Sequence, residues 1–161
     1  MLQTPFRVVV MGVSGCGKST VGHLLAGRLA VPFVEGDDLH SAANVAKMAA
    51  GQPLTDEDRA GWLQALSERL HQSVAKDQGL VVACSALKKT YRDVLRQGAR
   101  DVLFVHLQGS PEELTRRLTQ RTAHYMPATL LQSQLAILEP PQSPEMAMTL
   151  DMLLPAEQQC K

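Results

Sequence analysis

Several features that mark other classes of protein are scarce in this chain. Its 161 residues include three cysteines, Cys16, Cys84 and Cys160, whose odd number and wide spacing argue against a disulfide framework or a C-x-x-C metal site. Sixteen basic and sixteen acidic side chains cancel, so no positive excess predicts a nucleic-acid or anionic-lipid partner. The apolar runs are far shorter than the roughly 20 residues of a membrane span. We therefore expect a single cytoplasmic domain over residues 1–161.

The chain contains a regular alternation of short apolar runs with amphipathic stretches. The apolar runs are residues 6–11, 32–35, 80–84, 102–107 and 147–154. Most are nearly continuous and rich in valine or leucine, which is typical of strands buried on both faces of a parallel sheet. Helical periodicity follows at residues 21–29 and again after Thr55, where Asp58 three residues later predicts an N-terminal cap. The alternation predicts a three-layer α/β fold with helices on both faces of the sheet.

The segment GVSGCGKST matches the phosphate-loop pattern G-x-x-x-x-G-K-[ST], and it has the required apolar run before it and helical pattern after it. Its glycines let backbone N–H groups face a phosphate, Lys18 reaches the β- and γ-phosphates, and the Ser19 hydroxyl binds Mg²⁺. The chain has no N-K-x-D segment, so a GTPase is not favoured. The pattern predicts an ATP site made of Gly12, Val13, Ser14, Gly15, Cys16, Gly17, Lys18, Ser19 and Thr20.

An acidic segment, EGDDLH at residues 35–40, ends the second apolar run. A carboxylate there lies beside the phosphate loop, where an acceptor hydroxyl must be oriented and deprotonated. We predict Asp37 for this role, and Glu35 as a second magnesium contact through water. The alternative is that Asp37 and Asp38 only cap a helix beginning near Ser41.

Two basic clusters are candidates for binding anions. The first, SALKKTYR at residues 85–92, follows the third apolar run, and its Lys88 and Arg92 suit an acidic acceptor. The second lies at residues 116–124, where Arg117 and Arg121 are i,i+4 neighbours on one helix face and His124 follows. We predict that it belongs to a lid at about residues 117–130, with Arg117 at ATP, Arg121 at the transferring phosphoryl group and His124 at the acceptor. The alternative for both clusters is ordinary solvated surface.

Taken together, the chain resembles the gluconate kinases of the thermoresistant type. The matching stretches are MGVSGCGKST, EGDDLH, NVAKMAAGQPLTDEDRAGWLQAL, VVACSALKKTYRDVLR, VHLQGSPEELTRRL and HYMPATLLQSQLAILEPP. The resemblance implies a P-loop kinase fold with a five-stranded parallel sheet in the order 2-3-1-4-5 and an acceptor region at about residues 37–76. It also implies transfer of phosphate from ATP to D-gluconate, giving 6-phospho-D-gluconate for carbohydrate acid catabolism. The acceptor's carboxylate would meet the Lys88 and Arg92 cluster, and its hydroxyls would meet Asp37 and His40.

Three departures from the family pattern qualify this interpretation. Glu35 stands where related kinases usually have Asp, and Gly61 where they commonly have Pro. The chain ends soon after its fifth apolar run, where the family has a final helix, so we expect a homodimer through that uncovered edge. Two alternatives remain open: a kinase for another acidic acceptor, such as shikimate or a nucleotide, and an ATP-binding protein with impaired turnover.

Overall fold

The structure is a computed structural model that describes residues 6–13, 17–52, 54–108, 134–141 and 147–151. Of residues 148–151 it describes the backbone only. Its strands and helices alternate along most of the chain. They are β1 (Arg7–Met11), α1 (Lys18–Leu29), β2 (Phe33–Glu35), the 3₁₀ helix η1 (Gly36–Leu39), α2 (Ala42–Ala49), α3 (Asp56–Ala75), β3 (Leu80–Ala83), α4 (Lys89–Gly98), β4 (Leu103–Gln108) and β5 (Ala147–Asp151). No helix in these ranges is long and apolar enough to cross a membrane.

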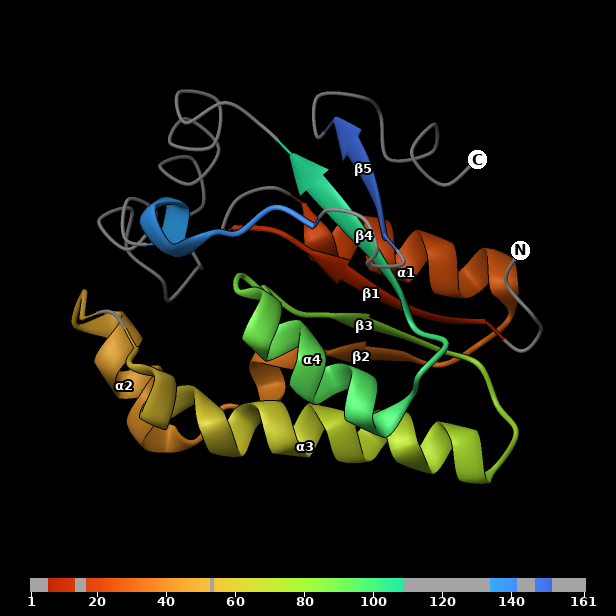
Figure 1. Cartoon of the computed structure of the whole chain (residues 1–161), viewed down its shortest axis with the longest axis horizontal. Helices are drawn as coiled ribbons and strands as arrows, with labels where there is room; N and C mark the ends of the chain where they lie inside the picture. The colour runs from red at the N-terminus through yellow and green to blue at the C-terminus, as the bar shows by residue number, and fades with distance from the viewer. Residues whose placement is uncertain (1–5, 14–16, 53, 109–133, 142–146, 152–161) are drawn as a thin grey trace.

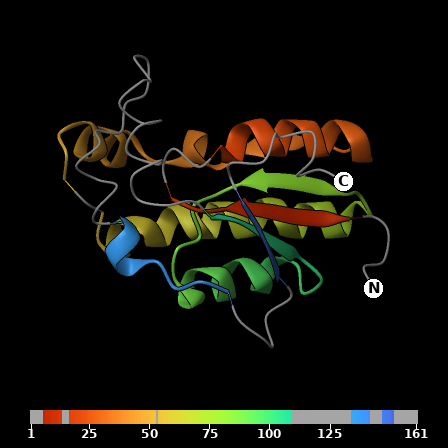
Figure 2. The same ribbon diagram turned by 90° about the horizontal axis from the view of Figure 1, so that it is seen from above.

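The strands form a parallel sheet in the order β2-β3-β1-β4-β5. At its centre, Val9 of β1 lies opposite Val82 of β3 on one side and Phe104 of β4 on the other. Helix α1 covers one face, while α4, with α3 packed against it, covers the other (Figures 1 and 2). The predicted α/β fold with a parallel sheet between helices is confirmed, and β2, β3, β1 and β4 follow the expected order.

The edge strand β5 pairs with β4, with Ala147 opposite Phe104. Most of its side chains lie outside the described residues, as do residues 152–161. The predicted homodimer through this edge therefore stays a prediction.

The core lies at the centre of the sheet. Val9, Val10, Met11, Val81 and Val82 have no exposed surface. Because helices cover both faces, side chains that alternate in direction along these strands are all buried, which explains the continuous apolar runs.

Helix starts follow local side-chain chemistry. Thr55 Oγ1 accepts from the Asp58 amide at 3.1 Å and Asp58 Oδ2 accepts from the Thr55 amide at 2.8 Å, so the predicted cap of α3 is confirmed as a full capping box. Ser41 caps α2, with its Oγ accepting from the Asn44 amide at 3.1 Å. The alternative role of Asp37 and Asp38 as caps of that helix is wrong, because both lie in η1.

One buried histidine has an unusual environment. His106 of β4 is 2% exposed, and its Nδ1 has no hydrogen-bond partner within the described part of the chain. Burial, and then the positive charge of Arg92, hold its pKa below the ordinary 6.5. The native state therefore disfavours the protonated imidazole relative to the unfolded chain.

We expect this histidine to make the protein less stable in mild acid. Because the unfolded chain binds the proton more readily, the free energy of unfolding should fall as pH drops below 6.5 and level off below the native pKa of His106. Chemical denaturation between about pH 7 and pH 5 measures the slope, and His106→Gln should reduce it. His71→Gln, which replaces an exposed histidine of α3, is the control. An unchanged slope in His106→Gln would contradict this account.

Candidate active site

Three loops meet at the C-terminal edge of the sheet, the side at which its parallel strands end. β1 leads into the phosphate loop, β2 into η1, and β3 into residues 84–88. The Gly12 amide donates to the Ser85 carbonyl at 3.3 Å, which joins the first loop to the third. The second loop packs closely on the end of β3 at Gly36. A side chain there would not fit, because its Cβ would lie 2.2 Å from the Ala83 carbonyl oxygen. Ligands of open α/β sheets bind at this edge.

The described part of the phosphate loop has the geometry expected for holding phosphate. Gly17 has φ 93°, in the region that favours glycine, and it is the N-cap of α1. Lys18 Nζ donates to the carbonyls of Gly12 and Val13, both at 3.1 Å, so the ammonium group lies over the loop. The positive end of α1 and this ammonium group favour an anion at the same place. Ser14, Gly15 and Cys16 lie outside the described residues.

Ser19 and Glu35 bring two side-chain oxygens together beside the loop. The Ser19 hydroxyl donates to a carboxylate oxygen of Glu35, which joins α1 to the end of β2. Hydroxyl and carboxylate oxygens are the ligands that Mg²⁺ prefers, usually together with water and phosphate oxygens. Among the described residues, no three His, Cys, Asp or Glu side chains cluster as a metal site.

Asp37 and His40 lie on η1 and directly after it, both half-buried. His40 stacks on Trp62 of α3, with ring centroids 4.1 Å apart, and Trp62 Nε1 donates to the Gly36 carbonyl at 2.7 Å. Asn44 Nδ2 lies 3.3 Å from His40 Nδ1. Burial lowers the pKa of His40, which disfavours the protonated ring. In the tautomer whose Nδ1 accepts from Asn44, the donor of His40 is Nε2–H.

The loop before α4 is held from two directions. Arg92 is 1% exposed and donates to the carbonyls of Ala86, at 2.8 Å, and Leu87, at 3.3 Å. Glu139 crosses from far along the chain: its amide donates to the Leu87 carbonyl at 2.7 Å, and its Oε1 accepts from the Lys89 amide at 2.9 Å. This carboxylate supplies the N-terminal cap that α4 lacks in its own sequence.

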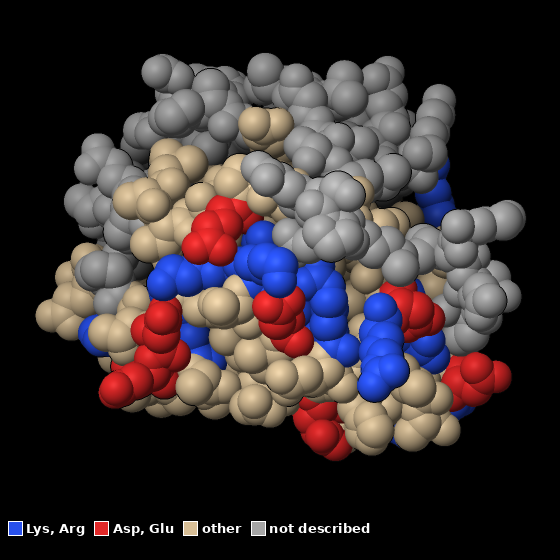
Figure 3. Space-filling model, viewed as in Figure 1, with Lys and Arg blue, Asp and Glu red and all other residues tan. Residues whose placement is uncertain are grey.

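Four side chains connect the first turns of α3 and α4, and we call them the Tyr91 cluster: Asp56, Arg59, Lys88 and Tyr91. Arg59 donates to the Tyr91 hydroxyl at 2.9 Å, and that hydroxyl donates to Asp56 Oδ1 at 2.5 Å. Lys88 Nζ also binds Asp56, at 3.2 Å. Basic and acidic side chains lie next to one another over this face of α3 and α4 (Figure 3).

Comparison with known proteins identifies the family. Residues 14–138 match the shikimate kinase family. The chain is 49% identical to a probable gluconokinase of Rattus norvegicus, over 89% of this chain and 88% of that protein. It is 53% identical to a gluconokinase of Gluconobacter oxydans, over 85% of this chain and 77% of that protein. The chain belongs to the gluconokinase family. The solved structure of a gluconokinase from Sinorhizobium meliloti agrees, with 46% identity, a TM-score of 0.86, and coverage of 97% of this chain and 87% of that one.

Membership of the gluconokinase family confirms the resemblance stated from the sequence and makes the chain a P-loop kinase, a family that uses ATP. The structure brings the predicted residues Gly12, Val13, Gly17, Lys18, Ser19, Glu35, Asp37 and His40 to one edge of the sheet, with Thr20 exposed on α1. Arg117, Arg121 and His124 lie outside the described residues, and so does the predicted lid. Their roles stay predictions.

The residues of the first basic cluster have different surroundings. Arg92 is buried and holds the loop at Ala86 and Leu87, and its predicted role as a ligand of the acceptor stays a prediction. Lys89 pairs with Asp93 one turn later, at 3.2 Å. Lys88 lies on the side chain of Asp56, and its predicted role toward the acceptor stays a prediction.

Several residues at this edge were not found from the sequence. Tyr91, Arg59, Asn44, Trp62 and Glu139 form the contacts described above, each with a partner that is distant along the chain or on another element. The available signal was the i,i+3 spacing of Asp56 with Arg59 and of Lys88 with Tyr91, which puts each pair on one helix face. That spacing cannot show that the two faces meet.

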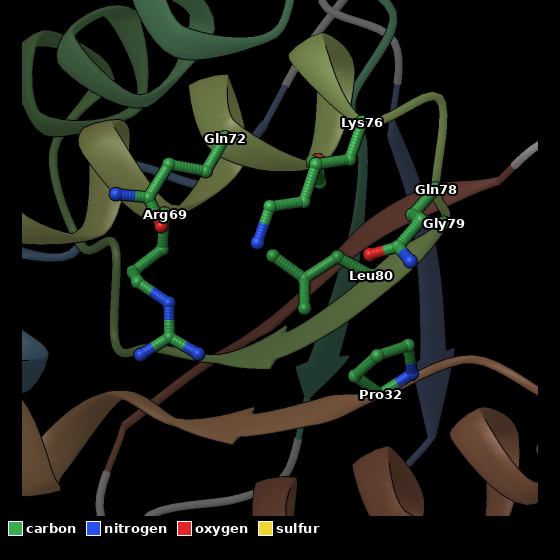
Figure 4. Close-up of a pocket in the computed structure, with 8 residues that line it drawn as sticks. Pro32, Arg69, Gln72, Lys76, Gln78, Gly79 and Leu80 are labelled. Atoms are coloured by element: carbon green, nitrogen blue, oxygen red, sulfur yellow. The ribbon is translucent and has the colours of Figure 1, made fainter.

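A pocket also lies at the N-terminal edge of the sheet, the side at which its strands begin, next to the start of β3 (Figure 4). Pro32, Gly79 and Leu80 form its floor, and Arg69 and Lys76 reach into it from α3. Both cations are exposed, and the strands begin here rather than end. This pocket is therefore separate from the edge that carries the phosphate loop.

Proposed function

We propose that this protein transfers the γ-phosphoryl group of ATP to D-gluconate, giving 6-phospho-D-gluconate and ADP. The observation that carries the proposal is the identity of about half of the residues to gluconokinases over most of the chain. The structure supports it with a phosphate loop, a carboxylate and a lysine from three neighbouring loops at one edge of the sheet.

Each residue has a role that its position supports. Lys18 neutralises charge on the β- and γ-phosphates, and Asp37 orients the acceptor hydroxyl and accepts its proton. Ser19 would hold Mg²⁺ directly and Glu35 through water, and the ion when bound neutralises phosphate oxygens. His40 donates from Nε2 to a hydroxyl of the acceptor. Lys88 pairs with its carboxylate.

An ADP-release assay over several acceptors tests the proposal. With MgATP, D-gluconate should stimulate ADP release, whereas D-glucose, shikimate and a nucleoside monophosphate should leave it at the rate without acceptor. Mass spectrometry of the product should show one phosphoryl group on gluconate. Stimulation by shikimate instead would favour the kinase named by the matching family. ATP binding without stimulation by any acceptor would indicate an ATP-binding protein without transfer activity.

A further inference from the structure

The Asp56 carboxylate in the Tyr91 cluster is held by two converging donors. Tyr91 Oη donates to its Oδ1 at 2.5 Å, and Lys88 Nζ lies 3.2 Å from Oδ1 and 3.4 Å from Oδ2. Arg59 donates to the same tyrosine oxygen at 2.9 Å, so the tyrosine proton is directed at the carboxylate. The start of α4 thus forms a site that already binds one carboxylate.

The fixed and the movable parts of this site differ in burial. Arg59 is 7% exposed and Tyr91 4%, so these two side chains are locked by their surroundings. The Asp56 side chain is 65% exposed and that of Lys88 28%. An exposed ion pair contributes little to stability. The ion pair with Lys88 therefore holds Asp56 only weakly, and the Tyr91 hydroxyl stays in place to donate to the carboxylate that replaces it.

The charge of the cluster also favours a carboxylate. Arg59 and Lys88 lie 5.3 Å and 5.6 Å from the centre of the Tyr91 ring, and Asp56 is the one anion among the four residues. If Asp56 turned away, two positive charges would face one empty position. Burial, and then the hydrogen bond to Asp56, raise the pKa of Tyr91, so its hydroxyl remains a donor at neutral pH.

We propose that the carboxylate of the acid acceptor takes the position of the Asp56 carboxylate, on Lys88 Nζ and Tyr91 Oη, while Asp56 turns into solvent. The inference rests on the proposed function, in which the acceptor is gluconate. It makes Tyr91 a further acceptor-binding residue and Asp56 an internal competitor. A neutral sugar has no carboxylate to replace Asp56, so the exchange favours acids over the sugars that resemble them.

The position suits an acceptor whose other end lies at Asp37. The first turn of α3 is tied to the Asp37 loop, because Asn44 Nδ2 donates to the Asp58 carbonyl at 2.8 Å and also lies 3.3 Å from His40 Nδ1. The two ends of the proposed acceptor site thus lie on segments that Asn44 connects.

Steady-state kinetics of three variants tests this exchange. Asp56→Asn should lower the KM for gluconate by roughly two- to fivefold, the scale of an exposed ion pair, because the competitor has lost its charge. Tyr91→Phe keeps the buried ring and should raise that KM roughly tenfold or more, the scale of a hydrogen bond to a charged group. The KM for ATP should stay the same in both. Glu57→Gln removes a neighbouring charge from the same turn of α3 and should change neither constant.

Each other outcome overturns the exchange. A higher gluconate KM in Asp56→Asn would mean that Asp56 positions Lys88 instead of competing with the acceptor. An equal decrease of the gluconate KM in Glu57→Gln would mean that any negative charge on this turn of α3 weakens gluconate binding. An unchanged gluconate KM in Tyr91→Phe would remove Tyr91 from the site. Thermal unfolding shows which variants are folded, and gluconate-dependent activity of the unmodified protein tests the proposed function separately.

Discussion

Lys18→Ala is expected to lower turnover at saturating ATP and gluconate by roughly a thousandfold, the scale seen when one fixed charge or donor at a transition state is removed. Lys18 Nζ lies on the carbonyls of Gly12 and Val13, at the end of the strand that delivers the phosphate loop. The side chain is only half-buried and contributes nothing to the apolar core, so the variant should fold.

The measurement is ADP release together with circular dichroism of the same sample. Lys76→Ala, at the opposite edge of the sheet, is the control and should keep normal turnover (Figure 4). A folded Lys18→Ala protein with normal turnover would show that the phosphate loop does not serve phosphoryl transfer here.

Asp37→Asn is expected to cut turnover by roughly a hundred- to ten-thousandfold, the usual contribution of a general base, and to leave ATP affinity nearly unchanged. Asn has the shape of Asp but cannot accept a proton from the acceptor hydroxyl. Asp37 is half-buried in η1, on the loop that Trp62 and Gly36 hold against α3 and β3.

Its neighbour supplies a matched control. Asp38→Asn changes the same charge one residue along η1, at an exposed position, and should have a small effect on turnover. Calorimetric titration with ATP separates binding from catalysis. If Asp37→Asn lost ATP binding while the bound complex still turned over normally, Asp37 would belong to the metal site. Equal losses in both variants would assign the effect to charge alone.

On the acceptor side, the sequence predicted the positions of some residues better than those of others. The second apolar run predicts Glu35 and Asp37 beside the phosphate loop, because parallel strands end at a common edge. Glu35 meets Ser19 there, and the role of Asp37 stays a prediction. The same reasoning placed Lys88 and Arg92 together, yet the structure separates them: Lys88 meets Asp56, whereas Arg92 is buried under its own loop. Both lie within one turn of α4, so their different surroundings come from what packs on that turn.

The sequence alone determined the local structure. Apolar runs buried on both faces predict strands such as β1, the Thr55 and Asp58 pair predicts where α3 begins, and the spacing of Gly12, Gly17 and Lys18 predicts the phosphate loop, because each depends on residues within a few positions. Only the tertiary structure decided that Tyr91 joins Arg59 to Asp56, over separations of 32 and 35 residues, and that Glu139 caps α4 from 50 residues away. Such contacts depend on which helix faces pack against each other in the folded protein. The periodicity of each segment shows which face is apolar, but not which other segment packs against it.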